Sequence, residues 1–276
     1  MSGLESLATE RGILALLALD HRDALRNAFA RAGVDAVDEE TMLAAKRRIA
    51  AALAPHVSGI LLDEASAKLA APPGLPVVLP LEEQGHETLE GGRINRLQRP
   101  PATACAAHKL LLYYRADHDA SASRQRALAE QAAAIARAAG VPLVLEPLVY
   151  RLDGEDETAY GSRFGELVAA AAADLAGSSA AVLKLQFPGD DCSALTDASA
   201  PLPWALLGGS DVDGETFVRQ LEVACDAGGS GFIAGRAIWS GALGLDGDDA
   251  DAWLAGRAAP LLARLRRTAD LRGRPI

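Results

Sequence analysis

The chain has 276 residues and half of them are hydrophobic, so its length and composition allow one large domain with a sizeable core. Its 27 lysines and arginines stand against 37 aspartates and glutamates, which gives a net charge of −10 at pH 7. This charge disfavours nonspecific binding to nucleic acid or to an acidic membrane surface, so we expect neither partner, and an anionic substrate would need a local basic pocket.

The N-terminal region and the cysteines indicate the cellular compartment. The first apolar stretch is short and is followed at once by Asp20, so we expect neither a signal peptide nor a membrane span. The cysteines Cys105, Cys192 and Cys225 are far apart and show no CxxC spacing, which is typical of free thiols in a reducing compartment. We therefore predict a cytoplasmic protein.

Apolar runs bounded by turn residues recur along the chain and predict β-strands. There are eight, over 12–20, 58–64, 76–82, 108–115, 142–150, 180–188, 203–210 and 230–239. Amphipathic, alanine-rich stretches predict helices over 38–56, 121–140 and 213–229, with less distinct helices over 163–179 and 248–270. Residues 83–105 are predicted as a loop with one short helical turn.

Eight strands alternating with helices predict an α/β fold, a single-domain (β/α)8 TIM barrel over residues 1–276. No linker rich in glycine or serine and no change of composition divides the chain. The alternative is an open, doubly wound sheet, but no G-x-G-x-x-G motif follows the first strand.

A lysine stands in the middle of the apolar run "AAVLKLQFP". The ammonium group of Lys184 must reach water or lose its charge, because burial disfavours the charged form. The ordinary interpretation is an edge strand whose lysine points outward. The charges on the other strands favour a second interpretation.

In a (β/α)8 barrel the catalytic side chains come from the carboxyl ends of the strands. The charged residues there are Asp20, Lys109, Glu146, Lys184 and Arg236, with Asp63, Glu64 and Glu82 on strands two and three. Two lysines and two carboxylates on neighbouring strands would converge in one small space, where pairing keeps them in the core and perturbs their pKa values. A lysine with a second cation nearby can then attack a carbonyl group.

Metal chemistry has less support. The histidines do not show metal-ligand spacing; they are His21, His56, His86, His108 and His118. A magnesium ion held by Asp63, Glu64 and Glu82 is an alternative to salt bridges at these positions. We predict no metal and no cofactor.

Two late strands end in small residues, in "LLGGSD" and "IAGRAIW". Barrels commonly bind phosphate at the loops after strands seven and eight, where backbone N–H groups can approach an anion. The predicted phosphate site comprises Gly208, Gly209, Ser210, Gly235 and Arg236. The alternative is that the glycines only make tight turns.

The sequence resembles a known family over most of its length, in order from about residue 11 to about residue 245. The motifs are "LALDHRDALR", "HKLLLYYR", "LVLEPLVY", "LKLQFP" and "WALLGGSDVDGETFVRQLEVACDAGGSGFIAGRAIW". They are similar to those of class I tagatose-1,6-bisphosphate aldolases and the related sulfofructosephosphate aldolases.

The resemblance implies a metal-independent (β/α)8 aldolase that cleaves a phosphorylated ketose to dihydroxyacetone phosphate and an aldehyde through a Schiff base. Lys184 matches the imine-forming lysine of the family and Glu146 its proton-transfer glutamate. Lys109 and Asp20 match a lysine and an aspartate that hold charge and hydroxyl groups. Barrel aldolases are commonly oligomers, so we expect a homo-oligomer.

The sequence also departs from the family pattern. His21 replaces a glutamine before Arg22, and Gln186 replaces an acidic residue two positions after Lys184. We expect His21, Arg22 and Gln186 to contact the substrate. Loops 83–105 and 151–162 are expected to select the distal group, which is phosphate, sulfonate or neither; the residues in or near them are Arg93, Asn95, Arg96, Arg151 and Arg163.

Two other functions are open to the sequence. One is a catalytically idle barrel that senses sugar phosphates and regulates a partner, although such a protein has no need for a lysine in the centre of a strand. The other is a metal-dependent sugar-phosphate isomerase, which requires that the carboxylates of strands two and three bind an ion. Retention of activity in EDTA would argue against the isomerase.

Overall fold

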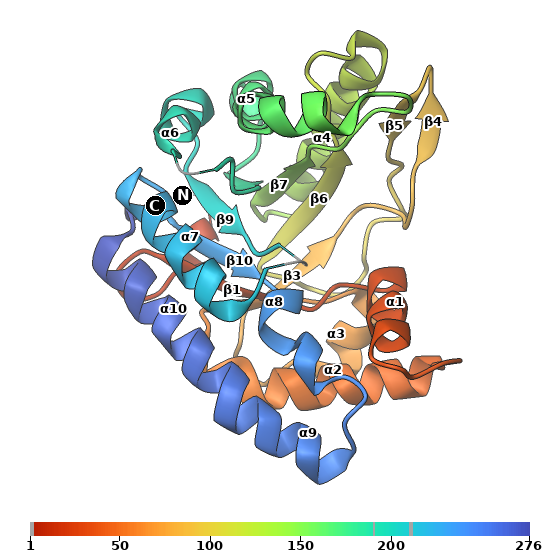
Figure 1. The fold of residues 1–276 in the computed structure, drawn as a ribbon, viewed down its shortest axis with the longest axis vertical. Helices are drawn as coiled ribbons and strands as arrows, with labels where there is room; N and C mark the ends of the chain where they lie inside the picture. Colours follow the sequence, from red (N-terminus) through yellow and green to blue (C-terminus); the bar gives the residue numbers. More distant parts are fainter. Residues whose placement is uncertain (1–2, 190, 210–211) are drawn as a thin grey trace.

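The computed structural model describes residues 3–189, 191–209 and 212–276. Parallel strands form a closed barrel in the order β1, β10, β9, β8, β7, β6, β3, β2 (Figure 1). They are β1 (Leu14–Ala18), β2 (Gly59–Leu61), β3 (Val77–Pro80), β6 (Ala107–Tyr113), β7 (Leu143–Leu148), β8 (Val182–Leu185), β9 (Trp204–Leu207) and β10 (Gly231–Ala234). Each overlaps one of the eight predicted runs, and β6 begins one residue before its run, so the predicted (β/α)8 barrel is confirmed.

The barrel strands are buried on both faces, as expected of a parallel sheet covered by helices. Alternate residues such as Leu14 and Leu16 fill the barrel interior, whereas Ala15 and Leu17 pack outward into the core beneath the helices. Because both faces are buried, hydrophobic runs rather than alternating patterns mark the strands.

Helices surround the barrel (Figure 1). They are α1 (Asp23–Arg31), α2 (Glu39–Leu53), α3 (Glu64–Ala70), α4 (Asp119–Ala138), α5 (Glu157–Ala176), α6 (Ser193–Ser199), α7 (Gly214–Asp226), α8 (Arg236–Trp239), α9 (Gly247–Trp253) and α10 (Ala259–Arg272). Short 3-10 turns cover Gly3–Leu7, Ala54–His56 and Ser240–Ala242, and a π turn, Leu254–Ala258, joins α9 to α10.

Aspartate caps begin several of these helices. The side chains of Asp38, Asp156 and Asp213 accept hydrogen bonds from the backbone N–H three residues ahead, at the starts of α2, α5 and α7. The predicted helices over 38–56, 121–140 and 213–229 are confirmed. Helices α1, α3 and α6 were not expected, because each has fewer than ten residues.

The prediction for residues 83–105 was wrong in part, because this segment contains an antiparallel hairpin of β4 (Glu87–Leu89) and β5 (Gly92–Ile94) and no helical turn. Glu90 and Gly91 form the turn with φ values of 51° and 84°, the left-handed conformation that two-residue hairpins require. The hairpin replaces a helix between β3 and β6, and β5 lies beside α4 (Figure 1).

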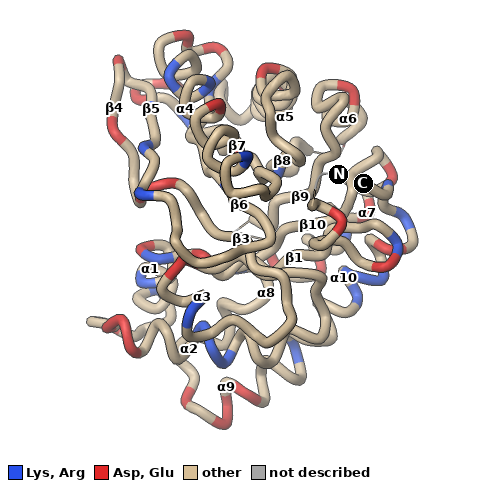
Figure 2. The backbone as a smooth tube through the Cα atoms, turned by 180° about the vertical axis from the view of Figure 1, so that it is seen from behind, with Lys and Arg blue, Asp and Glu red and all other residues tan. Residues whose placement is uncertain are grey.

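Charged residues lie mainly on the outer helices and loops, with both signs mixed, while most of the barrel strands carry none (Figure 2). None of the described helices is long and apolar enough to cross a bilayer.

Candidate active site

Three charged residues lie inside the barrel on adjacent strands, Lys109 on β6, Glu146 on β7 and Lys184 on β8. Their exposed fractions are 4%, 5% and 5%. Each follows by two positions an apolar residue of the barrel interior, which are Ala107, Val144 and Val182. Because side chains alternate along a strand, the charges form the next layer of the barrel interior, toward the carboxyl ends of the strands.

Glu146 lies between the two ammonium groups. Its Oε1 is 2.9 Å from the Nζ of Lys184, and its Oε2 is 3.0 Å from the Nζ of Lys109. Burial alone would raise the pKa of the Glu146 carboxyl, but the charges of Lys109 and Lys184 outweigh it and the pKa lies below its usual value. The nearest charge to Lys184 is therefore a carboxylate, and not the second lysine that the strand pattern indicated.

Lys109 is the centre of a larger network. Its Nζ is 3.2 Å from Asp20 Oδ2 and 2.7 Å from Glu82 Oε1. Burial would lower the pKa of Lys109, but the charges of Asp20, Glu146 and Glu82 raise it well above its usual value. The three carboxylates therefore favour the cationic form of Lys109.

Glu82 was not predicted as part of this network. Its second oxygen accepts a hydrogen bond of 3.1 Å from the backbone N–H of Leu111, so both oxygens are engaged and Lys109 is held in place. The sequence signal for this contact is the position of Glu82, two residues after Pro80 at the end of β3. Pro80 pairs with Lys109 on β6, so the side chains of Glu82 and Lys109 face the same side of the two strands. The sequence indicated this carboxylate either as a metal ligand or as part of a salt bridge, and the salt bridge is the one that forms.

Asp20 and His21 follow β1 and line the same cavity. Burial would raise the pKa of Asp20, but Lys109, His21 and Lys184 lower it below its usual value. Burial and the nearby cation of Arg236 lower the pKa of His21 to about 4, against the opposing effect of Asp20. His21 is therefore uncharged at neutral pH and offers a hydrogen-bonding ring rather than a charge.

Only some of the residues predicted to bind phosphate line this cavity. Gly208, Gly235 and Arg236 line the cavity, whereas Gly209 is outside its described lining and Ser210 lies outside the described residues. Arg236 is the first residue of α8, two residues after β10 ends, so its expected place on the strand was wrong.

The two cavity glycines are explained by close packing. A Cβ on Gly235 would lie 2.6 Å from the carbonyl oxygen of Ala18, and one on Gly208 would lie 2.8 Å from the Cα of Ala234. Neither glycine has a left-handed φ, so the tight-turn alternative does not account for them. The absence of side chains lets the ends of β9, β10 and β1 approach one another around the cavity.

Arg22 and Gln186 have structural partners. Arg22 lines the cavity and donates to Gln98 Oε1 at 3.3 Å and to the backbone oxygen of Glu82 at 3.1 Å. The amide of Gln186 accepts from the backbone N–H of Val149 at 2.6 Å and donates to its carbonyl oxygen at 3.3 Å. Gln186 therefore joins the end of β8 to the segment after β7, and it is not among the described residues that line the cavity.

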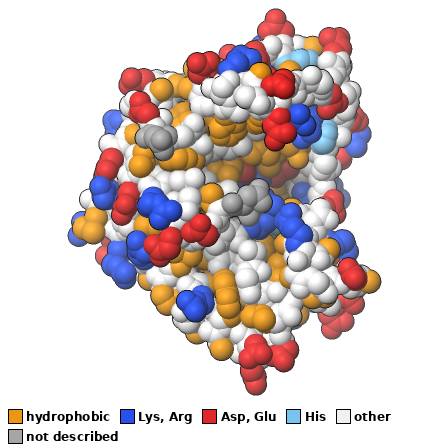
Figure 3. All heavy atoms as spheres, in the orientation of Figure 1, with side chains coloured by type: hydrophobic (Ala, Val, Ile, Leu, Met, Phe, Trp, Pro, Cys, Tyr) orange, Lys and Arg blue, Asp and Glu red, His pale blue; other side chains and the backbone are white. Residues whose placement is uncertain are grey.

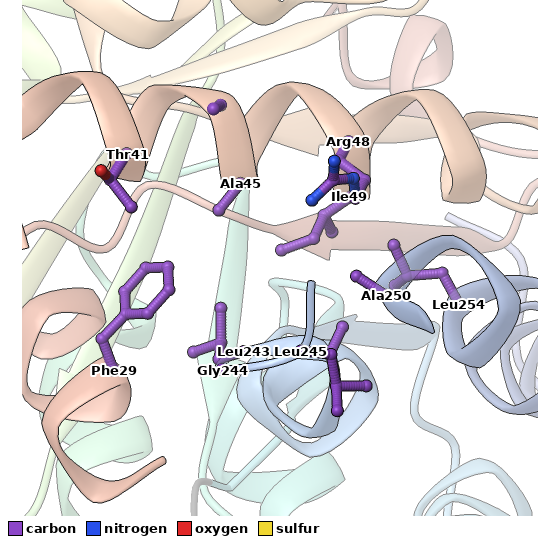
Figure 4. Close-up of a pocket in the computed structure, with 12 residues that line it drawn as sticks. Phe29, Thr41, Ala45, Arg48, Ile49, Leu243, Gly244, Leu245, Ala250 and Leu254 are labelled. Atoms are coloured by element: carbon purple, nitrogen blue, oxygen red, sulfur yellow. The ribbon is translucent and has the colours of Figure 1, made fainter. Parts of the chain in front are cut away.

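The cavity over these residues has a volume of about 530 Å³, within the range of small-molecule sites. A space-filling view shows the molecule hollowed on this face, with charged and histidine side chains on the rim beside β4 and β5 (Figure 3). Another hollow of about 130 Å³, lined by apolar side chains such as Phe29, Ile49 and Leu254, lies between the outer helices (Figure 4). Only the first of these two contains a lysine paired with a carboxylate.

The carboxylates considered as magnesium ligands have separate partners. Asp63 pairs with Lys46 and caps α3, Glu64 is bonded to Lys68, and Glu82 is bonded to Lys109. Asp63 and Glu64 also lie beyond β2, which ends at Leu61, and not on the strand as expected. Among the described residues, no group of three or more His, Cys, Asp or Glu side chains could hold a metal ion.

Residues 14–241 match the model of a protein family described as "DeoC/LacD family aldolase". A tagatose 1,6-diphosphate aldolase of Listeria monocytogenes serotype 4a is 26% identical, with 90% of this chain and 84% of the relative aligned. Tagatose 1,6-diphosphate aldolase 1 of Streptococcus mutans is 27% identical, with 88% of this chain and 85% of the relative aligned. A structure of a Schiff base-forming fructose-1,6-bisphosphate aldolase has the same fold, with a TM-score of 0.66, 19% identity and coverage of 94% of this chain and 98% of that one.

Proposed function

Because the chain belongs to the DeoC/LacD family of aldolases and is a carbon–carbon lyase, we propose that it cleaves a ketose 1-phosphate to dihydroxyacetone phosphate and an aldehyde through an imine on Lys184. The substrate is of the tagatose 1,6-bisphosphate or 6-deoxy-6-sulfofructose 1-phosphate type. The observation that carries this proposal is the buried pair of Lys184 and Glu146, at 2.9 Å inside a cavity that also holds Lys109 and Arg236.

Imine formation begins at Lys184. Its ammonium group loses a proton to water, and the resulting amine adds to the substrate carbonyl carbon C2. The former carbonyl oxygen receives protons and leaves as water, and a protonated imine remains. The lowered pKa of Glu146 means that it starts as a carboxylate, the form that a base requires.

Carbon–carbon cleavage uses the imine as an electron sink. A base removes the proton of the C4 hydroxyl group, the C3–C4 bond breaks, and its electrons move into the imine to form an enamine. The aldehyde leaves, the enamine is protonated at C3, and hydrolysis of the imine releases dihydroxyacetone phosphate. Glu146 takes the part of base and acid, because it is the carboxylate nearest to the Lys184 nitrogen.

The other charges orient the substrate. Lys109 stays cationic because three carboxylates surround it, so it holds hydroxyl oxygens as negative charge develops on them. Asp20 accepts hydrogen bonds from hydroxyl groups while remaining ionised. Arg236 begins α8 just after β10, in the region where barrels commonly bind phosphate, and takes the phosphate on C1.

A coupled assay for dihydroxyacetone phosphate across a panel of ketose phosphates tests the function directly. The panel comprises tagatose 1,6-bisphosphate, fructose 1,6-bisphosphate, fructose 1-phosphate and 6-deoxy-6-sulfofructose 1-phosphate. We expect dihydroxyacetone phosphate from at least one of these, at the same rate with and without EDTA. No product from any member, or a rate abolished by EDTA and restored by a divalent cation, would contradict the proposal.

A further inference from the structure

The pairing between β7 and β8 stops just before Glu146 and Lys184. The last described pair of this ladder is Leu145 with Leu183, one residue before each of them. On its other side each strand is paired as far as its last residue, β7 with β6 and β8 with β9. Within the described part of the chain, the pairing of β7 with β8 therefore does not extend to the Glu146–Lys184 contact of 2.9 Å.

A proline explains the interruption. The backbone N–H of Tyr114 donates to the carbonyl oxygen of Leu148 at 2.9 Å, so the backbone of Leu148 faces β6. Successive residues of a strand direct their backbone groups to opposite neighbours, so Pro147 faces β8. Because proline has no N–H, it cannot donate to a ladder. The backbone hydrogen bond that would join β7 to β8 beside Glu146 is therefore missing.

The side chain of Gln186 supplies a link between the same two segments. Its Oε1 accepts from the N–H of Val149 at 2.6 Å, and its Nε2 donates to the carbonyl oxygen of Val149 at 3.3 Å. The hydroxyl group of Tyr160 also donates to this oxygen, at 3.3 Å, whereas among the described residues the N–H of Val149 has no other acceptor. One amide thus offers both a donor and an acceptor to the buried backbone of Val149.

This link lies next to the Glu146–Lys184 contact. Gln186 follows Lys184 by two residues, and Val149 follows Glu146 by three. The contact is therefore held between the last backbone pair of the two strands on one side and the amide of Gln186 on the other. Gln186 is not among the described residues that line the cavity, so it can act on the pair without touching the substrate.

We propose that Gln186 is a positioning residue, whose amide takes the place of the backbone hydrogen bond that Pro147 removes and so holds Glu146 against Lys184. This inference rests on the proposed function, because it concerns the alignment of the proposed base with the proposed nucleophile. It gives Gln186 a different part from the substrate contact that the sequence indicated.

Turnover measures the alignment. Gln186→Met keeps the length of the side chain but removes its donor and its strong acceptor. With the ketose phosphate that the wild type cleaves fastest, we expect kcat to fall by about 10-fold or more, since small displacements of an acid–base group are costly. KM should change by less than about 2-fold, because the substrate contacts remain. An unchanged kcat in Gln186→Met would overturn the proposal.

The pKa of Glu146 gives a readout that does not depend on activity. Lys109 on β6 and Lys184 on β8 lower this pKa, against burial and the charge of Asp20 after β1. If Lys184 moves away in Gln186→Met, one of the lowering charges is weaker, and we expect the midpoint to rise by about 0.5 pH unit or more. A carbon-13 NMR titration measures it on the carboxyl signal that is absent in Glu146→Gln. An unchanged midpoint would contradict the positioning role.

Restoring the missing N–H tests the replacement itself. Pro147→Ala returns a backbone donor to β7, and alone it should leave kcat within about 2-fold of the wild type. Combined with Gln186→Met it should recover at least about 3-fold of the lost kcat, because the link no longer depends on the amide. Equal kcat for Gln186→Met with and without Pro147→Ala would overturn the replacement. If Gln186→Met does not fold, recovery of the folded state in the double variant gives the same answer.

The matched control loses two side-chain hydrogen bonds at the opposite end of the barrel. The hydroxyl group of Thr196 donates to the carbonyl oxygen of Ala227 and accepts from Nε1 of Trp204, where β9 begins. Thr196→Val should lower the free energy of unfolding and leave kcat and the Glu146 midpoint unchanged. Equal changes in Thr196→Val and Gln186→Met would mean that Gln186 only stabilises the fold. If the wild type cleaves no ketose phosphate, the proposed function fails, while the Glu146 midpoint still decides the positioning role.

Discussion

Glu146 is within hydrogen-bonding distance of Lys184 through one carboxylate oxygen, at 2.9 Å, and its other oxygen is 3.0 Å from a second lysine. A proton can therefore move between the proposed nucleophile and its base without rearrangement of either side chain. This arrangement differs from two lysines in direct contact, since the carboxylate separates the two positive charges.

Glu146→Gln keeps the shape of this side chain but removes the base. We expect imine formation with dihydroxyacetone phosphate to persist and turnover to fall by roughly 10²- to 10⁴-fold, the range for a positioned acid–base group. Borohydride trapping and steady-state kinetics measure the two effects separately. Loss of the trapped adduct would assign Glu146 to imine formation itself, and the exposed Glu166→Gln on α5 serves as the unchanged control.

Arg236→Ala tests the expected phosphate contact. Loss of a charge-assisted hydrogen bond pair should weaken binding of the phosphorylated substrate by about 2 kcal/mol or more, seen as a rise in KM of roughly 30-fold. Arg219→Ala, at an exposed position on α7, should change neither KM nor kcat. Unchanged kinetics in Arg236→Ala would mean that the phosphate binds elsewhere.

Gln186→Glu separates a substrate contact from a structural link. A carboxylate can accept from the N–H of Val149 but cannot donate to its carbonyl oxygen, so we expect a loss of about 1–3 kcal/mol in the free energy of unfolding. Urea unfolding measures it, with the exposed Gln131→Glu on α4 as the control. A changed KM with unchanged stability would instead support the substrate contact that the sequence indicated.

Acid unfolding depends on Asp20. Its pKa in the folded protein lies below the unfolded value of about 3.9, so ionised Asp20 contributes stability above that pH and loses it as the pH falls through the folded pKa. The free energy of unfolding of the wild type should therefore exceed that of Asp20→Asn by a constant amount between about pH 5 and 7, and this difference should shrink below about pH 4. A difference that stays constant or grows in acid would contradict the network described for Lys109.

The barrel and its central charges were predictable because both follow from local patterns. Hydrophobic runs mark parallel strands, and the two-residue period places Lys109, Glu146 and Lys184 on the inward face once the strands are correctly assigned. The pairing of the charges was harder to predict from the sequence. The contact of Glu82 with Lys109 depends on the register of β3 against β6, which no local pattern encodes.

Other features depend on turns and on long-range contacts. The β4–β5 hairpin was missed because its strands are short and its signal is the pair Glu90 and Gly91 with positive φ. The setting of Arg93 between Tyr113 and Tyr150 joins residues from three separate segments. Such contacts require the tertiary structure, even though the sequence indicated that this loop matters for the substrate.

Borohydride reduction in the presence of dihydroxyacetone phosphate tests the central claim, that Lys184 forms the imine. The wild type should gain one reduced adduct, and peptide mapping should place it on Lys184. Lys184→Met, of similar length but unable to form an imine, should fold and lose both the adduct and the cleavage activity. An adduct on Lys109, or labelling that persists in Lys184→Met, would contradict the assignment, and the absence of any adduct in an active wild type would contradict the imine mechanism.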